Sequence, residues 1–197
     1  FDPPDLSDWP TLALDFTKSR RVNLDALTKA DLSTWKAGET LLLSGKLLTG
    51  RDAAHKRLVE MMARGEKLPV DFTNRVIYYV GPVDPVRDEV MGPAGPTTAT
   101  RMDKFTEMML AQTGLFGMIG KAERGPATIE SIRKHGAAYL IATGGAAYLV
   151  SKAIRAAHVV AFPELGMEAV WRIEVEAFPA FILVDDKGND FFAQLGC

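Results

Sequence analysis

TLLLSGKLLTGRDAAHKRLVEMMARGE, residues 40–66, is the stretch of the sequence that says most about the fold. It opens with an apolar run that ends near Gly50, which is typical of a buried β-strand. Leu58 and Met62 then recur at helical spacing, and Gly65 is a residue type that commonly ends a helix. The stretch therefore predicts a strand, a turn and a helix.

The same alternation continues on both sides of this stretch. Further predicted strands are residues 21–24, RVIYYV (75–80), LFGMIG (115–120), AAYLIAT (137–143) and VVAF (159–162). Further predicted helices are residues 26–35, TTATRMDKFTEMMLAQTG (97–114), residues 127–134 and GGAAYLVSKAIRAA (144–157). Strands that alternate with helices favour an α/β fold with a largely parallel sheet.

The last part of the chain has a different pattern. AVWRIEVEAF (169–178) and AFILVDD (180–186) follow each other without a helix between them, and DDKGND (185–190) has the residues of a turn. Consecutive strands of this kind are typical of antiparallel pairing. We therefore expect a largely parallel sheet with an antiparallel C-terminal part.

Composition limits the classes of protein to which the chain can belong. Its 197 residues are 47% hydrophobic, the formal net charge is −2, and no apolar stretch, such as residues 177–184, is long enough to span a bilayer. Cys197 is the single cysteine, so it forms no internal disulfide and holds no metal cluster alone. These features predict a cytoplasmic protein without a nucleic-acid or membrane partner. The Pro- and Asp-rich start predicts that residues 1–19 are a linker or tail from a preceding domain, and that residues 20–197 form the domain itself.

The strand-to-helix junctions carry cationic, hydroxyl and glycine residues. Parallel sheets bind ligands at the carboxyl ends of their strands, and glycines and free helix amides favour an anion there. The junction residues are Thr49 to Asp52, Gly95 to Arg101, Gly120-Lys121 and Thr143 to Gly145. Arg51, Arg101 and Lys121 would complete a site for a carboxylate or a phosphate.

Structural explanations exist for the same residues. Thr97 or Thr98 could be a helix N-cap, and the arginines could simply be solvated. Cations nevertheless disfavour helix N-termini, so two arginines at such positions need a compensating reason. His55 is interpreted as a residue with a structural hydrogen bond, and Cys197 as an exposed end residue.

Six segments carry a resemblance to a known family. They are GRDAAHKRL (50–58), IYYVGPVDP (77–85), GPAGPTTATRMDKF (92–105), MIGKAERG (118–125), ATGGAAYL (142–149) and ELGMEAVWRIEVEAFPAFILVDDKGNDFF (164–192). From about residue 20 onward, the chain resembles the C-terminal domain of iron–sulfur class I fumarases and the β subunits of related two-subunit fumarases and L-tartrate dehydratases.

The resemblance implies a swivelling β/β/α domain of a homodimeric hydro-lyase that reversibly hydrates fumarate to L-malate. It also implies a [4Fe–4S] cluster, bound by cysteines of a partner N-terminal domain and not by this chain. The substrate-binding positions match Arg51, Thr97, Arg101 and Lys121, of which Thr97 and Lys121 are the catalytic candidates. Thr97 matches the threonine proposed to transfer the proton at carbon.

Two departures from the family pattern concern the substrate. Thr100 and Ala122 stand where many members have glycine, so the substrate could be fumarate, tartrate or mesaconate. Because a neutral hydroxyl is a poor base, Thr97 could transfer the proton with cationic help or only orient the substrate. Two other classes remain: a phosphate- or nucleotide-binding α/β module, although no GxxxxGK[ST] sequence occurs, and a non-catalytic interaction domain.

Overall fold

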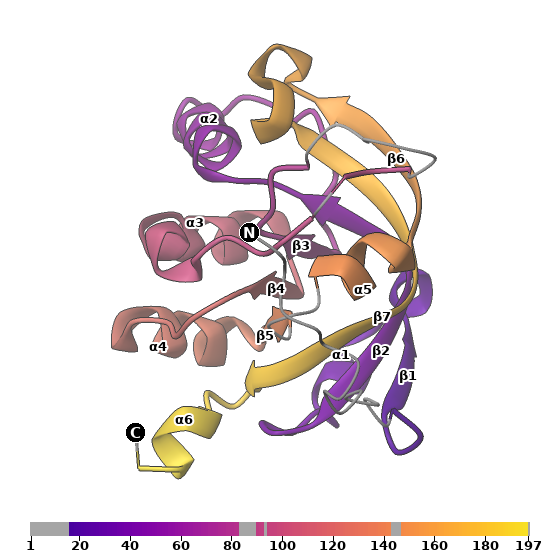
Figure 1. The fold of residues 1–197 in the computed structure, drawn as a ribbon. Coiled ribbons are helices and arrows are strands. Elements are labelled where there is room, and N and C mark those ends of the chain that lie inside the picture. The colour runs from indigo at the N-terminus through magenta and orange to yellow at the C-terminus, as the bar shows by residue number, and fades with distance from the viewer. Residues whose placement is uncertain (1–15, 83–89, 93, 143–146, 197) are drawn as a thin grey trace, which may run out of the picture.

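The computed structural model describes residues 16–82, 90–92, 94–142 and 147–196, which form a mixed α/β fold (Figure 1). Its strands are β1 (Arg20–Asn23), β2 (Thr40–Thr49), β3 (Val76–Tyr78), β4 (Gly117–Gly120), β5 (Ala138–Ala142), β6 (Ile154–Ala161) and β7 (Val170–Val184). Its helices are α1 (Lys29–Leu32), α2 (Asp52–Ala63), α3 (Asp103–Thr113), α4 (Pro126–His135), α5 (Ala147–Ala153) and α6 (Phe191–Gln194), with 3₁₀ turns η1 (Leu24–Ala26), η2 (Ala99–Met102) and η3 (Pro163–Glu168). No helix in the described ranges is long and apolar enough to cross a membrane.

The seven strands form one sheet that is partly parallel and partly antiparallel. Strands β1 to β5 pair in parallel in chain order, whereas β7 is antiparallel to β2, β5 and β6. This confirms the expected parallel sheet with an antiparallel C-terminal part. Because β7 pairs with both β5 and β2, the strands β2, β3, β4, β5 and β7 close into a ring.

Two hydrophobic clusters occupy the two faces of this ring. One cluster contains alternate side chains from all five ring strands, including Leu43, Tyr78, Ile119, Leu140 and Phe178. The other packs the intervening strand residues against α2, α3 and α4. Figure 1 shows these three helices stacked on one side of the sheet, while β6 and β7 curve along the other. Because successive side chains of a strand point to opposite faces, one set packs inside the ring and the other set packs against the helices.

The helix boundaries follow the signals expected from the sequence. Gly114 has φ +68 at the end of α3, and Gly136 has φ +57 at the end of α4. Glycine adopts such left-handed conformations without a steric penalty. Pro126 opens α4, where its missing N–H has no helical partner to lose. The predicted ends of these helices are confirmed.

The predicted helix 26–35 is too long, because only η1 and the short helix α1 form in that region. Three further predictions are corrected by the pairing of strands. Residues 169–178 and 180–186 are not two strands, because the single strand β7 continues through Ala177, whose φ is +52. The predicted helix 144–157 ends at Ala153, since the following residues pair with β7 as β6. The predicted helix 97–114 begins later, as 3₁₀ turn η2 followed by α3. In each case pairing between distant strands overrides local preference. The proposed linker, residues 1–19, lies mostly outside the described residues.

The positive φ of Ala177 gives a stability prediction. A residue with a Cβ pays a steric cost in this conformation, so Ala177→Gly should raise the free energy of unfolding by about 0.5–1 kcal/mol. Ala180→Gly, on the same strand with a buried alanine in ordinary pairing, should instead lower it. Denaturant unfolding of both variants measures the difference, and equal destabilisation of the two would contradict the expectation.

Candidate functional site

Residues 97–99 insert between the ends of β3 and β4, and we call them the 97–99 insert. The last direct link between these strands runs from the Tyr79 amide to the Ile119 carbonyl, at 2.8 Å. Beyond it, the Thr97 amide donates to the Tyr79 carbonyl at 2.7 Å. The Lys121 amide donates to the Thr97 carbonyl at 3.2 Å, and the Ala99 amide to the Lys121 carbonyl at 2.9 Å. Thr97 and Lys121 are thereby held on adjacent main-chain segments.

Arg51 and Arg101 lie at the same edge of the sheet. Arg51 follows β2, and the Gly50 amide before it donates to the Tyr78 carbonyl at 3.1 Å. Arg101 belongs to η2, and its Nη2 lies 3.2 Å from Oδ2 of Asp52. The structure thus brings together the ends of β2, β3 and β4 with all four predicted site residues. The predicted junction residues Thr143 to Gly145 lie outside the described residues.

Two glycines allow the close approaches that the site requires. A Cβ on Gly81 would lie 2.9 Å from Nη1 of Arg51, so the guanidinium packs directly on the main chain there. A Cβ on Gly120 would lie 2.9 Å from the Cβ of Ala99, a residue of the 97–99 insert. A side chain at Gly120 would therefore displace the insert.

The site contains three cations and two carboxylates. Arg101 pairs with Asp52, and Nε of Arg51 lies 3.7 Å from Oε1 of Glu168. The Lys121 ammonium makes no ion pair or hydrogen bond with any residue that the structure describes. Within this group of five, the net charge is positive, so an anion is favoured.

The guanidinium of Arg51 also has unused hydrogen-bonding capacity. Its Nε is buried, yet it has no hydrogen-bond partner among the described residues, because the Glu168 carboxylate is too far away. A buried donor without a partner is costly, and an oxygen of a bound ligand would satisfy it. The side chain as a whole is 25% exposed, so a small ligand can reach it.

Sequence reasoning identified the cations but missed their carboxylate partners. Asp52 comes directly after Arg51, and Glu168 belongs to the ELGMEA segment that contributed to the family resemblance. Glu168 and Arg51 are far apart in the chain, so no local sequence pattern predicts their contact. The segment was recognised, but its role beside Arg51 was not.

The alternative that Thr97 or Thr98 is a helix N-cap is met in position by Thr98, but without a capping hydrogen bond. Thr98 occupies the N-cap position of η2, but its side chain makes no capping hydrogen bond, and α3 is preceded by Met102. Both threonines are half-buried. Thr98 instead forms a parallel β-bridge with Lys121, so its place is fixed by main-chain pairing.

His55 has the hydrogen bond expected of it. Its Nδ1 lies 2.9 Å from the carbonyl oxygen of Arg51, and its ring packs against Tyr79 and Phe105. Burial lowers the pKa of His55 to about 4, because the charged imidazolium would lose its hydration. The neutral imidazole therefore donates from Nδ1 to the Arg51 carbonyl and fixes the start of α2.

The described residues offer no ligand set for an iron–sulfur cluster. They contain no group of three or more His, Cys, Asp or Glu side chains that could hold a metal ion. Cys197 lies outside the described residues. The residues present therefore do not fit a [4Fe–4S] cluster, whose irons take cysteine thiolates.

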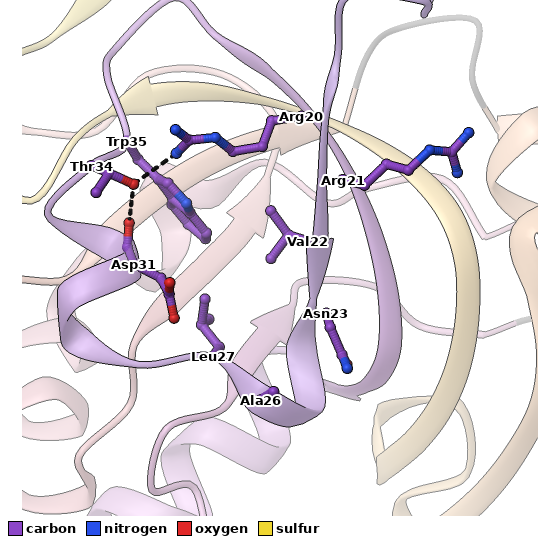
Figure 2. Close-up of a pocket in the computed structure, with 9 residues that line it drawn as sticks. All are labelled: Arg20, Arg21, Val22, Asn23, Ala26, Leu27, Asp31, Thr34 and Trp35. Atoms are coloured by element: carbon purple, nitrogen blue, oxygen red, sulfur yellow. Dashed lines mark hydrogen bonds between the residues drawn. The ribbon is translucent and has the colours of Figure 1, made fainter.

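A separate hollow of about 430 Å³ lies beside β1 (Figure 2). It is lined by residues 20–23, 26, 27, 31, 34 and 35. Arg20 donates to Oγ1 of Thr34 at 2.7 Å, and Thr34 donates to the Asp31 carbonyl at 2.7 Å. Since β1 pairs with the first half of β2, this hollow is at the opposite end of the parallel strands from Arg51. It is not part of the candidate site.

Comparisons with known proteins identify relatives along nearly the whole chain. A family model described as Fumarase C-terminus matches residues 1–195. The aerobic class I fumarate hydratase of Escherichia coli is 46% identical over 179 residues, which are 89% of this chain and 33% of that protein. Fumarate hydratase 2 of Leishmania major is 41% identical over 193 residues, 96% of this chain and 34% of that protein.

A shorter relative matches over most of its own length. The putative L(+)-tartrate dehydratase subunit beta of Methanocaldococcus jannaschii is 36% identical over 174 residues, 86% of this chain and 89% of that protein. The chain therefore spans about a third of the length of the fumarate hydratases it matches and most of the length of this subunit.

The neutral state of His55 gives a pH prediction. Its pKa is lower in the folded chain than the ordinary value of about 6.5, so its contribution to stability is present above pH 6.5 and is lost as the pH falls towards 4. Between pH 7.5 and pH 5 this group should remove about 2 kcal/mol from the free energy of unfolding. Urea unfolding at several pH values measures it.

The matched variant is His55→Asn, whose amide can still donate towards the Arg51 carbonyl but does not titrate. Its stability should fall less between the same two pH values, whatever its stability at pH 7.5. Parallel curves for the wild type and this variant would show that His55 is not the group responsible.

Proposed function

The chain belongs to the fumarase C-terminus family, and we propose that it is the substrate-binding, C-terminal part of a class I fumarate hydratase. The whole enzyme would interconvert fumarate and L-malate by reversible hydration. The names of its relatives support this proposal, as does the match to the family model over residues 1–195.

One structural observation carries the proposal for this chain's own residues. Arg51, Arg101 and Lys121 gather at the carboxyl ends of neighbouring strands, beside the hydroxyl-bearing Thr97. A dicarboxylate needs two cationic positions, and the buried Nε of Arg51 is a donor without a partner. The same cations would also stabilise the extra negative charge that a carboxylate takes on when the neighbouring C–H bond breaks.

Thr97 is the residue we propose for proton transfer at carbon, with Lys121 as its close neighbour. The Lys121 amide donates to the Thr97 carbonyl, so the two residues lie on adjacent main-chain segments, with Lys121 directly opposite Thr98 in the parallel bridge. A nearby cation favours the deprotonated form of a hydroxyl and so improves it as a base. Arg51 and Arg101 would hold the two carboxylates, with Asp52 and Glu168 restraining their guanidinium groups.

The remaining parts of the enzyme are assigned to other segments. We propose that an N-terminal partner domain holds the [4Fe–4S] cluster, which supplies Lewis-acid chemistry to the hydration. The aerobic class I fumarate hydratase of Escherichia coli, of which this chain matches 33%, has room for such a domain. The proposal includes a cytoplasmic homodimer and a swivelling β/β/α type of domain, which the strand ring with helices outside it supports.

A second candidate is a tartrate hydro-lyase. The 36% identity with a putative tartrate dehydratase subunit favours it, and Thr100 and Ala122 are the two positions at which the resemblance to the fumarase pattern is broken. Tartrate carries one hydroxyl more than malate, so a polar side chain near the pocket is relevant to the choice. Rates with L-malate, L-tartrate and mesaconate separate these substrates.

The experiment that tests the function uses the chain with and without its upstream domain. The complete, cluster-loaded enzyme should form L-malate from fumarate, whereas the isolated chain should show no hydration. Failure of the complete enzyme to hydrate fumarate would refute the proposed activity. Tighter binding of inorganic phosphate or a nucleotide than of L-malate would favour the phosphate-binding alternative instead.

Arg101→Ala in the complete enzyme should lower kcat as well as raise KM. The carboxylate that Arg101 would bind gains charge in the transition state, so kcat/KM should fall by roughly tenfold or more. The control is Arg155→Ala, an exposed arginine paired with Glu176, which should leave both constants unchanged. An increase in KM at constant kcat would show instead that Arg101 binds the substrate and the transition state equally well.

Thr97→Val should nearly abolish hydrogen–deuterium exchange at C3 of malate while leaving malate binding largely intact. The substitution keeps the side-chain volume and removes the hydroxyl, and the main-chain bonds of the insert remain. Thr98→Val is the matched control, and because Thr98 makes no capping bond it should affect neither exchange nor thermal stability appreciably. Full exchange in Thr97→Val would exclude Thr97 from proton transfer.

A further inference from the structure

Arg124 is a cation that lies wholly inside the domain. Its side chain is 0% exposed. Its Nε donates to Oδ1 of Asp103 at 2.6 Å, and its Nη2 donates to Oγ1 of Thr106 at 2.6 Å. Its guanidinium lies 5.6 Å from the ring centroid of Tyr79 and 4.8 Å from that of Tyr139. Burying a charge is unfavourable unless it is paired and hydrogen-bonded, so a residue of this kind needs a specific reason.

Three of the residues around Arg124 also bond to segments at or next to the candidate site. The carboxylate of Asp103, two residues after Arg101, also accepts from the Gly125 amide at 2.8 Å. The hydroxyl of Tyr139 donates to the Ala122 carbonyl at 2.8 Å, directly after Lys121. The carbonyl of Tyr79 accepts the Thr97 amide. One guanidinium therefore contacts three groups that also bond to segments at or next to the site.

The segment that carries Lys121 needs such support. Ala122 has φ +65, a backbone conformation that residues with a side chain rarely adopt. The carbonyl of the next residue, Glu123, is held by the Thr100 hydroxyl at 3.0 Å. Arg124 then anchors the segment in the core. Arg124 is thus the buried end of the segment that starts at Lys121.

We propose that Arg124 is a positioning residue for the dicarboxylate site, which holds the segments that carry Lys121 and Arg101 against the 97–99 insert. This inference rests on the proposed function, since it names a residue that acts on the same site. Arg124 does not touch the substrate, because its guanidinium is enclosed by Asp103, Thr106 and the two tyrosine rings. Its effect reaches the site through the Asp103 carboxylate and the Ala122 turn.

The test uses Arg124→Met and Arg124→Lys in the complete, cluster-loaded enzyme. Arg124→Met keeps most of the volume but no hydrogen bond, and kcat per loaded enzyme should fall by roughly 10- to 100-fold. Arg124→Lys keeps the charge and one bond to Asp103, so it should recover part of this loss. The control is Arg133→Met on α4, an exposed arginine paired with Glu130, which should retain wild-type kcat and KM.

A milder variant covers the case in which Arg124→Met does not fold. Thr106→Val removes the acceptor of Nη2 together with the hydrogen bond that the Thr106 hydroxyl donates to the Met102 carbonyl, and it should give a folded enzyme with a smaller loss of kcat. If Thr106→Val and Arg124→Lys both lower the melting temperature but keep wild-type kcat and KM, Arg124 serves stability alone and the inference is wrong.

Amide hydrogen exchange separates this inference from the proposed function. In Arg124→Lys and Thr106→Val, the amides of Ala99 and Lys121 should lose protection more than the β2 amides that pair with β7. An even loss over the whole domain would overturn the positioning role. A wild-type enzyme without hydratase activity would refute the proposed function, and the exchange pattern would still decide whether Arg124 sets the position of Lys121.

Discussion

The hydrogen bonds of the 97–99 insert are the constraint on which the candidate site depends. Strands β3 and β4 separate after the link from Tyr79 to Ile119, and their next main-chain groups would lack partners if nothing filled the gap. The insert satisfies these groups and places Thr97 between the ends of two strands. The insert continues directly into η2, where Arg101 forms an ion pair with Asp52. The main-chain pairing at the strand ends therefore brings the segments that carry the hydroxyl and the cations to one edge of the sheet.

Beneath this site, the core contains two basic side chains in opposite states. His55 is neutral, because burial lowers its pKa and Arg124 adds a smaller effect of the same sign. Arg124 stays charged between Tyr79 and Tyr139 and is matched by Asp103. The layer therefore adds no unmatched charge, and the field at the site comes from the residues above it, namely Arg51, Asp52, Arg101, Lys121 and Glu168.

Much of the fold and the cationic half of the site could be predicted, because their signals are local. Gly114 and Pro126 mark helix boundaries, and Arg51 and Lys121 follow strands that are visible in the sequence. The rest depends on partners distant in the chain. An alanine such as Ala177 does not by its residue type predict a left-handed backbone. The 97–99 segment precedes a helix-forming sequence, but its main chain bonds to the ends of β3 and β4 instead. The contact of Glu168 with Arg51 has the same long-range origin.

The closed strand ring also fixes the order in which the chain can acquire its structure. Thr40 pairs with Phe181, so β2 lacks its antiparallel neighbour until the ribosome has made almost the entire domain. Until then β2 and β5 expose free edges, which can pair with other chains. Closing so long a loop is slow compared with forming α2 or α3. The ring is therefore complete only when β7, the last strand of the chain, pairs with both β2 and β5.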